Sequence, residues 1–172
     1  AGGRHRWVDM AGLLGLAVSP LALGTGLFIL LYPLADPAAL ALPVTALVNA
    51  AMALPFVLRI LVPAARAVVA DHGRLGAQLD MGRGPFFRLV LLPRLAPQLG
   101  FAAGLGMALS LGDLGVIALF ANHEEATLPL QIYRLMGAYR MDAAAGASLL
   151  LMLLAFGAFW ICDHKGRAHA VA

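Results

Sequence analysis

The sequence predicts an all-α protein that crosses a membrane several times. Of its 172 residues 62% are hydrophobic and only 12% are charged, a balance that water-soluble domains rarely show. Four stretches contain no Asp, Glu, Lys or Arg, and they have 26, 22, 18 and 20 residues. Because a helix needs about 20 residues to cross the hydrocarbon core of a bilayer, we expect four transmembrane helices.

The basic residues are divided unevenly between the two sides that these helices define. With a cytoplasmic N-terminus, ten of the twelve Lys and Arg lie on the cytoplasmic side: Arg4, Arg6, Arg59, Arg66, Arg74, Arg83, Arg88, Arg94, Lys165 and Arg167. Only Arg134 and Arg140 lie outside. Cytoplasmic loops carry an excess of Lys and Arg, so both termini are predicted to be cytoplasmic. The net charge of +3 therefore reflects membrane orientation, and nucleic acid is not an expected partner.

The first two expected helices cover residues 10–35 and 37–58. The connection between them, residues 32–38, is short and contains two prolines, which predicts a tight external turn and antiparallel neighbouring helices. Asn49 lies at membrane depth in the second helix, where an amide needs a partner within the bundle or a wet cavity. An interhelical hydrogen bond is favoured over a ligand contact there.

The longest polar and basic interruption between apolar stretches is residues 64–93. A short helix is expected in the middle of this stretch, with Leu75 and Leu79 on one side. Gly82, Gly84 and the following proline are expected to end that helix and turn the chain. A polar helix held between two transmembrane helices is placed to contact something outside the bilayer.

The third expected helix covers residues 95–112 and carries Gly100 and Gly104 at the GxxxG spacing, which predicts a close helix crossing. The apolar run that follows, residues 114–122, has nine residues and is too short to span a bilayer. It is expected to be re-entrant or to lie at the membrane interface.

The region 113–142 is expected outside the membrane, with a short helix over residues 130–136, before the last transmembrane helix at 143–162. Asp113 stands at the outer end of the third helix. It either lies at the mouth of a pathway or caps a short helix over residues 114–120, and capping is slightly favoured.

Sequence patterns for covalent chemistry are missing. His123, Glu124 and Glu125 are not part of an HExxH motif, so a solvated loop is expected there and no metal site. No GxSxG motif surrounds a serine, and all five His fall in expected aqueous segments, which argues against an intramembrane serine protease. A P-loop is also absent, so another subunit would have to hydrolyse ATP. No cofactor is expected.

The stretch that closes with Leu92 and Pro93 resembles the Glu-Ala-Ala loop of permease subunits in bacterial binding-protein-dependent ABC importers. Without a gap, residues 74–76 stand where that family has Glu-Ala-Ala, Asp80 stands where it has Gly, and a Gly follows at 82. In the family, this loop forms a coupling helix that seats in a groove of the ATPase. The resemblance implies an ATPase-coupling surface at Arg74, Leu75, Gly76, Ala77, Leu79, Asp80, Gly82 and Arg83.

Four further stretches, residues 19–28, 42–56, 110–120 and 127–145, resemble the C-terminal half of the thiamine and thiamine pyrophosphate permeases. The Gly-Asp-x-Gly and Leu-Pro-x-x-Ile-Tyr elements also resemble molybdate and sulfate permeases. The resemblance implies that the chain lacks the first permease half and the opening of the second; its start without Met also suggests a fragment. Candidates for a substrate pathway or gate are Asn49, Ser110, Gly112, Asp113 and Gly115.

The implied protein is a MetI-like permease module in the bacterial inner membrane that imports thiamine, thiamine pyrophosphate or the substrate of a related molybdate, sulfate or iron importer. Its implied partners are an ABC ATPase subunit, a periplasmic substrate-binding protein, a second permease half and the lipid bilayer. An intramembrane enzyme and a non-transporting scaffold are the alternatives. Paired catalytic groups at one depth would favour the enzyme, and unchanged ATPase binding after alteration of residues 74–83 would favour the scaffold.

Overall fold

The computed structural model describes residues 19–34, 36, 39–120 and 127–168. Every regular element in this part of the chain is helical, which confirms the all-α prediction. The elements are α2 (Pro20–Leu31), α3 (Ala41–Gln78), α4 (Arg83–Phe86), the π-helical turn η1 (Phe87–Leu91), α5 (Leu92–Leu111), α6 (Ile117–Phe120), α7 (Leu128–Gly137) and α8 (Met141–Ala168).

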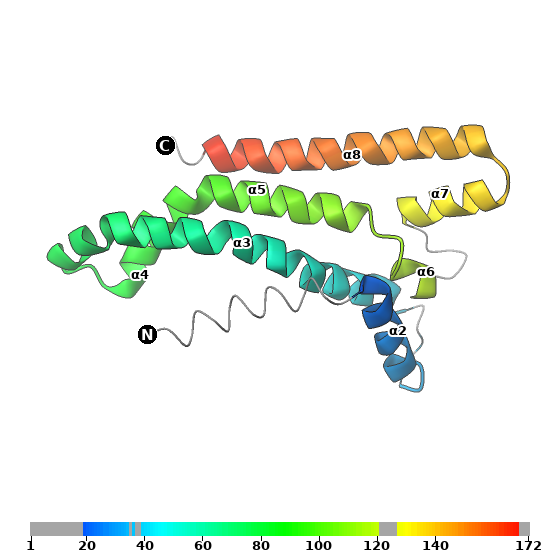
Figure 1. Cartoon of the computed structure of the whole chain (residues 1–172), viewed down its shortest axis with the longest axis horizontal. Coiled ribbons are helices and arrows are strands. Elements are labelled where there is room, and N and C mark those ends of the chain that lie inside the picture. Colours follow the sequence, from blue (N-terminus) through cyan, green and yellow to red (C-terminus); the bar gives the residue numbers. More distant parts are fainter. Residues whose placement is uncertain (1–18, 35, 37–38, 121–126, 169–172) are drawn as a thin grey trace.

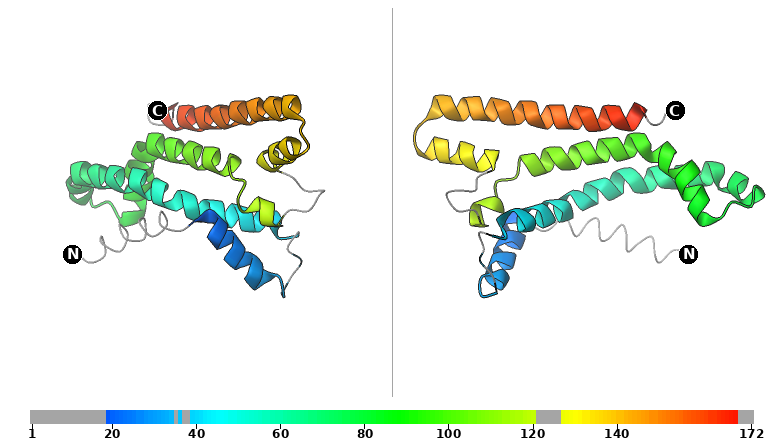
Figure 2. Two further views of the ribbon diagram at one scale, coloured as in Figure 1. Left: turned by 45° about the vertical axis from the view of Figure 1, so that its right-hand side comes forward. Right: turned by 180° about the vertical axis from the view of Figure 1, so that it is seen from behind.

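The three long helices α3, α5 and α8 run side by side with α5 between the other two (Figure 1). The short helices α2, α6 and α7 gather at one end of this layer. The turn between α3 and α4 lies at the opposite end, as does the C-terminal end of α8, and the view from behind shows the same order (Figure 2). Hence the two segments expected in the cytoplasm lie at one end of the molecule.

Among the described residues, three helical segments are long and apolar enough to cross a membrane: Ala41–Gln78, Arg83–Leu111 and Met141–Ala168. They contain the expected transmembrane stretches 37–58, 95–112 and 143–162, apart from residues 37–40 and residue 112. The described part of the first expected stretch is α2, which has 12 residues. Residues 10–18 of that stretch lie outside the described residues. The transmembrane helix expected over residues 10–35, the first of the four, therefore remains a prediction.

Helix α3 corrects the expected boundary between the second transmembrane helix and the coupling stretch. The sequence predicted a span ending at residue 58 and a separate short helix further on, whereas α3 continues for 38 residues through Pro55 and Pro63. Each proline removes one backbone hydrogen bond, but the alanines that follow Pro63 have the highest helix propensity, and the helix persists. At 1.5 Å per residue, α3 is about 57 Å long.

The buried core lies at the end formed by the short helices. It consists of Ala41, Val44, Val48, Val116, Ile117, Phe120 and Leu130. The ring of Phe28 on α2 stands edge-on to Phe120, with ring centroids 5.2 Å apart. The apolar run expected to be re-entrant or interfacial therefore packs, as far as residue 120, against α2 and α3. A run too short to cross the bilayer has buried its apolar side chains against protein instead.

The crossing of α5 and α8 depends on glycine. A Cβ atom built on Gly100 would lie 2.5 Å from the carbonyl oxygen of Cys162 and 2.8 Å from the Cα of Gly166. One built on Gly104 would lie 3.0 Å from atoms of Phe159. Only hydrogen fits at Gly100, and a Cβ at Gly104 would force Phe159 to shift, so the close crossing predicted from the GxxxG spacing is confirmed.

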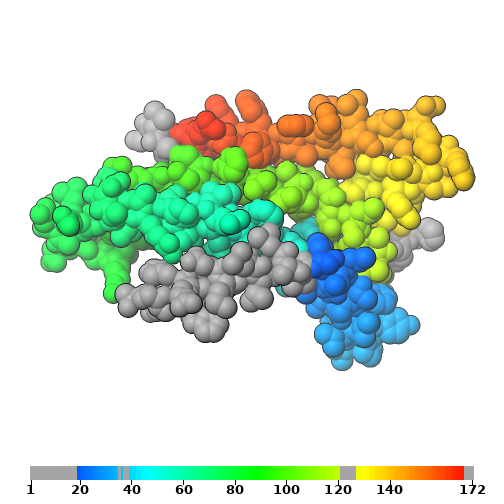
Figure 3. Space-filling view, in the orientation of Figure 1, coloured from blue at the N-terminus to red at the C-terminus, as the bar shows by residue number. Residues whose placement is uncertain are grey.

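The outer side of α8 is apolar and exposed through the middle of the helix. Met152 and Phe156 are 53% and 66% exposed, and Leu149, Leu150, Leu153 and Leu154 are also exposed. These residues form the upper edge of the molecule, coloured orange in Figure 3. A face of this composition suits lipid or another apolar helix and does not suit water.

Candidate functional site

The expected coupling stretch forms a helical hairpin whose turn is closed by backbone hydrogen bonds. The N–H of Met81 donates to the carbonyl of Gly76 at 2.9 Å, and the N–H of Asp80 donates to that of Ala77 at 3.2 Å. These two bonds are the Schellman arrangement that ends many helices. Asp80 has φ of 48°, in the left-handed region that favours glycine. Asp80, which stands where the resemblance places a glycine, therefore has a backbone conformation that glycine favours.

Replacing Asp80 with glycine is expected to stabilise the hairpin. A non-glycine residue in the left-handed region is disfavoured by about 1 kcal/mol, and Asp80→Gly removes this strain while keeping the turn. The thermal midpoint of the purified permease should rise in Asp80→Gly and fall in Asp80→Val. A lower thermal midpoint in the glycine variant would show that the carboxylate of Asp80 stabilises the turn. This stabilisation would then exceed the destabilisation from the left-handed backbone conformation of Asp80.

Gly76 and Gly82 have structural roles inside the hairpin. Gly76 is buried, and a Cβ built on it would lie 2.7 Å from the ring of Phe86, so this glycine lets the arms of the hairpin approach each other. Gly82 is the N-cap residue of α4, and its carbonyl accepts a hydrogen bond from the N–H of Phe86 at 3.1 Å. Of the expected coupling residues, Gly76 is therefore not available on the surface.

The remaining coupling candidates lie on the outside of the hairpin. Leu75 and Leu79 are 55% and 64% exposed, and Arg74, Ala77 and Arg83 are exposed as well. Beside them, between the arms, is a hollow of about 150 Å³, lined by His72, Leu75, Gly76, Leu79, Met81, Leu89, Val90 and Arg94. An exposed pair of leucines at the tip of a polar hairpin is the composition expected of a docking surface.

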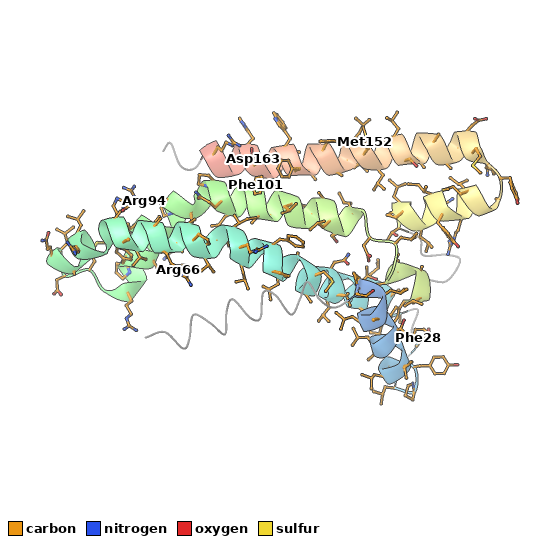
Figure 4. The ribbon with its side chains drawn as sticks, viewed as in Figure 1. Phe28, Arg66, Arg94, Phe101, Met152 and Asp163 are labelled. Carbon is orange, nitrogen blue, oxygen red and sulfur yellow. The ribbon has the colours of Figure 1, made fainter. Side chains whose placement is uncertain are left out.

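The hairpin end carries a positive charge. Residues 64–94 contain five arginines and two aspartates, a net charge of +3. Arg66 and Arg94 are labelled at this end in Figure 4. A bilayer with its headgroups is about 45 Å thick, and α3 is about 57 Å long, so an upright α3 that starts at the outer surface carries the hairpin beyond the inner headgroups.

The pathway candidates Asn49 and Ser110 bind each other. The side-chain amide of Asn49 on α3 donates to the hydroxyl of Ser110 on α5 at 3.1 Å. This bond confirms the interhelical interpretation of Asn49.

Gly112 is the C-cap of α5 and donates its N–H to the carbonyl of Ala108 at 3.2 Å, so it ends the helix just before Asp113.

The carboxylate of Asp113 is only partly satisfied. Its Oδ1 accepts the backbone N–H of Gly115 at 3.2 Å, a side-chain bond that closes the turn at this position. The α-helix begins at Ile117 and not at residue 114, so Asp113 is not its N-cap residue, and the expected capping role is corrected to closure of the preceding turn. The other oxygen, Oδ2, is buried and has no hydrogen-bond partner within the described residues. One oxygen thus closes the turn and the second is left for another donor.

Sequence reasoning missed Gln98, the one amide within the third expected transmembrane stretch. Its Oε1 is buried without a partner in the described part of the chain. The signal was the same as for Asn49, a lone amide at membrane depth. The metal candidates His123, Glu124 and Glu125 lie outside the described residues, among which no group of three metal-ligating side chains occurs.

The chain is similar to thiamine transport system permease proteins over nearly its whole length. It is 40% identical over 95% of its residues to the protein of this name, ThiP, from Brucella abortus. It is 33% identical over 95% and 91% of its residues to those of Salmonella typhimurium and Escherichia coli. The chain spans about 30% of the length of these relatives.

A shorter similarity links the chain to a second transport system. It is 36% identical over 44% of its residues to a putative 2-aminoethylphosphonate transport system permease protein of Salmonella paratyphi A. No protein-family profile and no solved structure matches the chain.

Proposed function

We propose, from this homology to the thiamine transport system permease proteins, that the chain is part of the inner-membrane permease of an ATP-driven importer for thiamine or thiamine pyrophosphate. The observation that carries the proposal is 40% identity over 95% of the chain to a permease of that name. The permease moves its substrate from a periplasmic binding protein to the cytoplasm and performs no covalent chemistry. The chain spans about 30% of such a relative, and a second permease half is a proposed partner.

The hairpin is the surface on which the ATPase subunit docks and through which ATP hydrolysis is coupled to transport. In this proposal the exposed Leu75 and Leu79 fill an apolar groove of that subunit, and the exposed Arg74, Asp80 and Arg83 lie at its rim. The length of α3 favours this role over a position flat on the inner leaflet, because an upright α3 carries the hairpin past the lipid headgroups. Buried apolar anchors with a polar rim are typical of such contacts.

Reconstitution tests the function directly. The full-length permease, with its ATPase in proteoliposomes and its binding protein outside, is expected to accumulate labelled thiamine only when ATP is enclosed. Uptake of molybdate or sulfate in place of thiamine would assign the chain to a related importer. No ATP-dependent uptake of any of them would reject the transport function.

The orientation is predicted with both termini and the hairpin in the cytoplasm. In a background with Cys162→Ser, a cysteine at Tyr139, which is 88% exposed between α7 and α8, should react with an impermeant thiol reagent applied to spheroplasts. A cysteine at Gly84, in the hairpin, should react only after permeabilisation. The reverse pattern would invert the topology and remove the hairpin from the side where ATP is hydrolysed.

Asp113 is proposed to attract the thiazolium cation at the outer mouth. Asp113→Asn keeps the turn-closing bond to Gly115 but removes the charge, so thermal stability should be unchanged while the uptake efficiency for thiamine falls about fivefold, the equivalent of about 1 kcal/mol. Asp113→Ala should lower both the thermal stability and the uptake efficiency. Normal uptake by the Asn variant would leave Asp113 with its turn-closing role alone.

A further inference from the structure

We propose that a hollow at the cytoplasmic end of α3, α5 and α8 binds the aminopyrimidine ring of the substrate before release, with Gln98 Oε1 accepting a hydrogen bond from the ring amino group. This inference rests on the proposed function. The hollow has a volume of about 250 Å³ and is lined by Ile60, Pro97, Gln98, Phe101, Asp163 and Arg167.

The hollow lies at the inner boundary of the membrane. Gln98 is one turn beyond Arg94, the last charged residue before the third expected transmembrane stretch, and Asp163 directly follows the last stretch. Phe101, near the middle of α5, and Asp163, near the C-terminal end of α8, are labelled close to each other in Figure 4. All three long helices contribute to its wall, so it forms only when α3 and α8 pack on either side of α5.

Gln98 lines this hollow and carries an unused hydrogen-bond acceptor. Its Oε1 is buried and has no hydrogen-bond partner within the described residues, and an unsatisfied amide oxygen away from water is unfavourable. If the side-chain amide turns toward the hollow, a substrate that donates an N–H can bind this oxygen during its passage.

The other polar groups favour a neutral ring over a cation. Nε of Arg167 lies 2.9 Å from Oδ2 of Asp163, so the two charges in the wall offset each other. The side chain of Asp163 is 19% exposed and that of Arg167 is 70% exposed, which places the carboxylate inside and the guanidinium toward the opening. A net-neutral wall offers hydrogen bonds but little attraction for an isolated positive charge.

Phe101 supplies an aromatic surface. Its ring stands edge-on to that of Phe159, with centroids 5.4 Å apart and an interplanar angle of 81°. This packing holds the ring of Phe101 at one side of the hollow, where a flat ligand can pack against it. An aromatic wall and an amide acceptor together recognise a flat ring that carries N–H donors.

Thiamine has two halves of different chemistry, a positively charged thiazolium and a neutral aminopyrimidine with an exocyclic amino group. The hollow matches the second half in charge and in hydrogen bonding. Asp113, at the opposite end of the layer, matches the first half. The two ends of the permease would thus recognise different parts of one substrate.

The test compares thiamine with its analogue in which the exocyclic amino group of the pyrimidine is replaced by oxygen. Initial uptake rates of both are measured for the full-length permease with its ATPase and binding protein, in wild type and in Gln98→Met, which keeps the length of the side chain. The ratio of variant to wild type cancels the selectivity of the binding protein. Thiamine uptake is expected to fall about fivefold, as for the loss of one hydrogen bond, while uptake of the analogue stays unchanged.

Gln131→Leu is the matched control, since Gln131 is an exposed glutamine on α7, outside the hollow. Gln98→Asn, which shortens the side chain but keeps the amide, provides a second variant if the Met variant fails to fold. Equal losses for the two substrates would mean that Gln98 pairs with another part of the permease, and this would overturn the inference. Unchanged uptake of both would overturn it as well. Failure of the wild type to transport thiamine would reject the proposed function itself. The variants test the inference about Gln98 only when the wild type transports thiamine.

Discussion

Ala77→Glu is expected to abolish ATP-driven uptake while leaving the permease in the membrane at its normal level. Ala77 is exposed on the hairpin between Leu75 and Leu79, the two leucines proposed to fill the ATPase groove. A carboxylate in a desolvated apolar contact without a partner is strongly unfavourable. A loss of about 3 kcal/mol in docking corresponds to a more than hundredfold lower affinity. Copurification of the ATPase measures the loss of docking, and uptake by proteoliposomes measures the loss of transport.

Ala70→Glu is the control for the added charge. Ala70 is also exposed, lies seven residues earlier on α3 and therefore on nearly the same side of the helix, and is about 10 Å further from the tip. It should bind the ATPase and transport normally. Normal uptake by Ala77→Glu would contradict docking at the hairpin, and retained ATPase binding without transport in the wild type would favour a scaffold.

Gly100→Val is expected to destabilise the packing of α5 on α8 by about 3 kcal/mol, at the upper end of what overpacking typically produces. A Cβ at this position would meet the carbonyl of Cys162 and the Cα of Gly166, and neither backbone atom can move without separating the helices. The purified permease should lose folded protein or show a clearly lower thermal midpoint. Because the hollow at Gln98 needs α8 beside α5, uptake should fall too.

Gly146→Val is the matched control on α8. A Cβ built on Gly146 meets nothing within 4 Å, so the same substitution there should leave the thermal midpoint nearly unchanged. A similar loss in both variants would indicate that valine harms the helix locally. Equal stability of Gly100→Val and wild type would refute the close crossing.

Local pattern was sufficient for several features of this protein. Uncharged stretches of suitable length indicated where the long helices lie, because length and apolarity are properties of a segment by itself. The spacing of Gly100 and Gly104 indicated a close crossing, and Asn49 at membrane depth indicated an interhelical bond; both were found. Assignment of the coupling surface depended on a resemblance, since the leucines and arginines there also suit a helix on a membrane surface.

Other features depended on which segments meet. The expected helix over residues 37–58 included Pro55, but the sequence did not indicate that α3 would continue through Pro63, because proline is a local helix-breaking signal that the alanines after it outweigh. Gly76 was expected on the surface, yet it faces Phe86 across the hairpin. Gln98 and Asp163 are 65 positions apart in the chain and come to one hollow only because α8 returns along α5. The sequence by itself determined which segments are helical and apolar; only the tertiary structure decided which polar groups share a site, because that depends on contacts between distant segments.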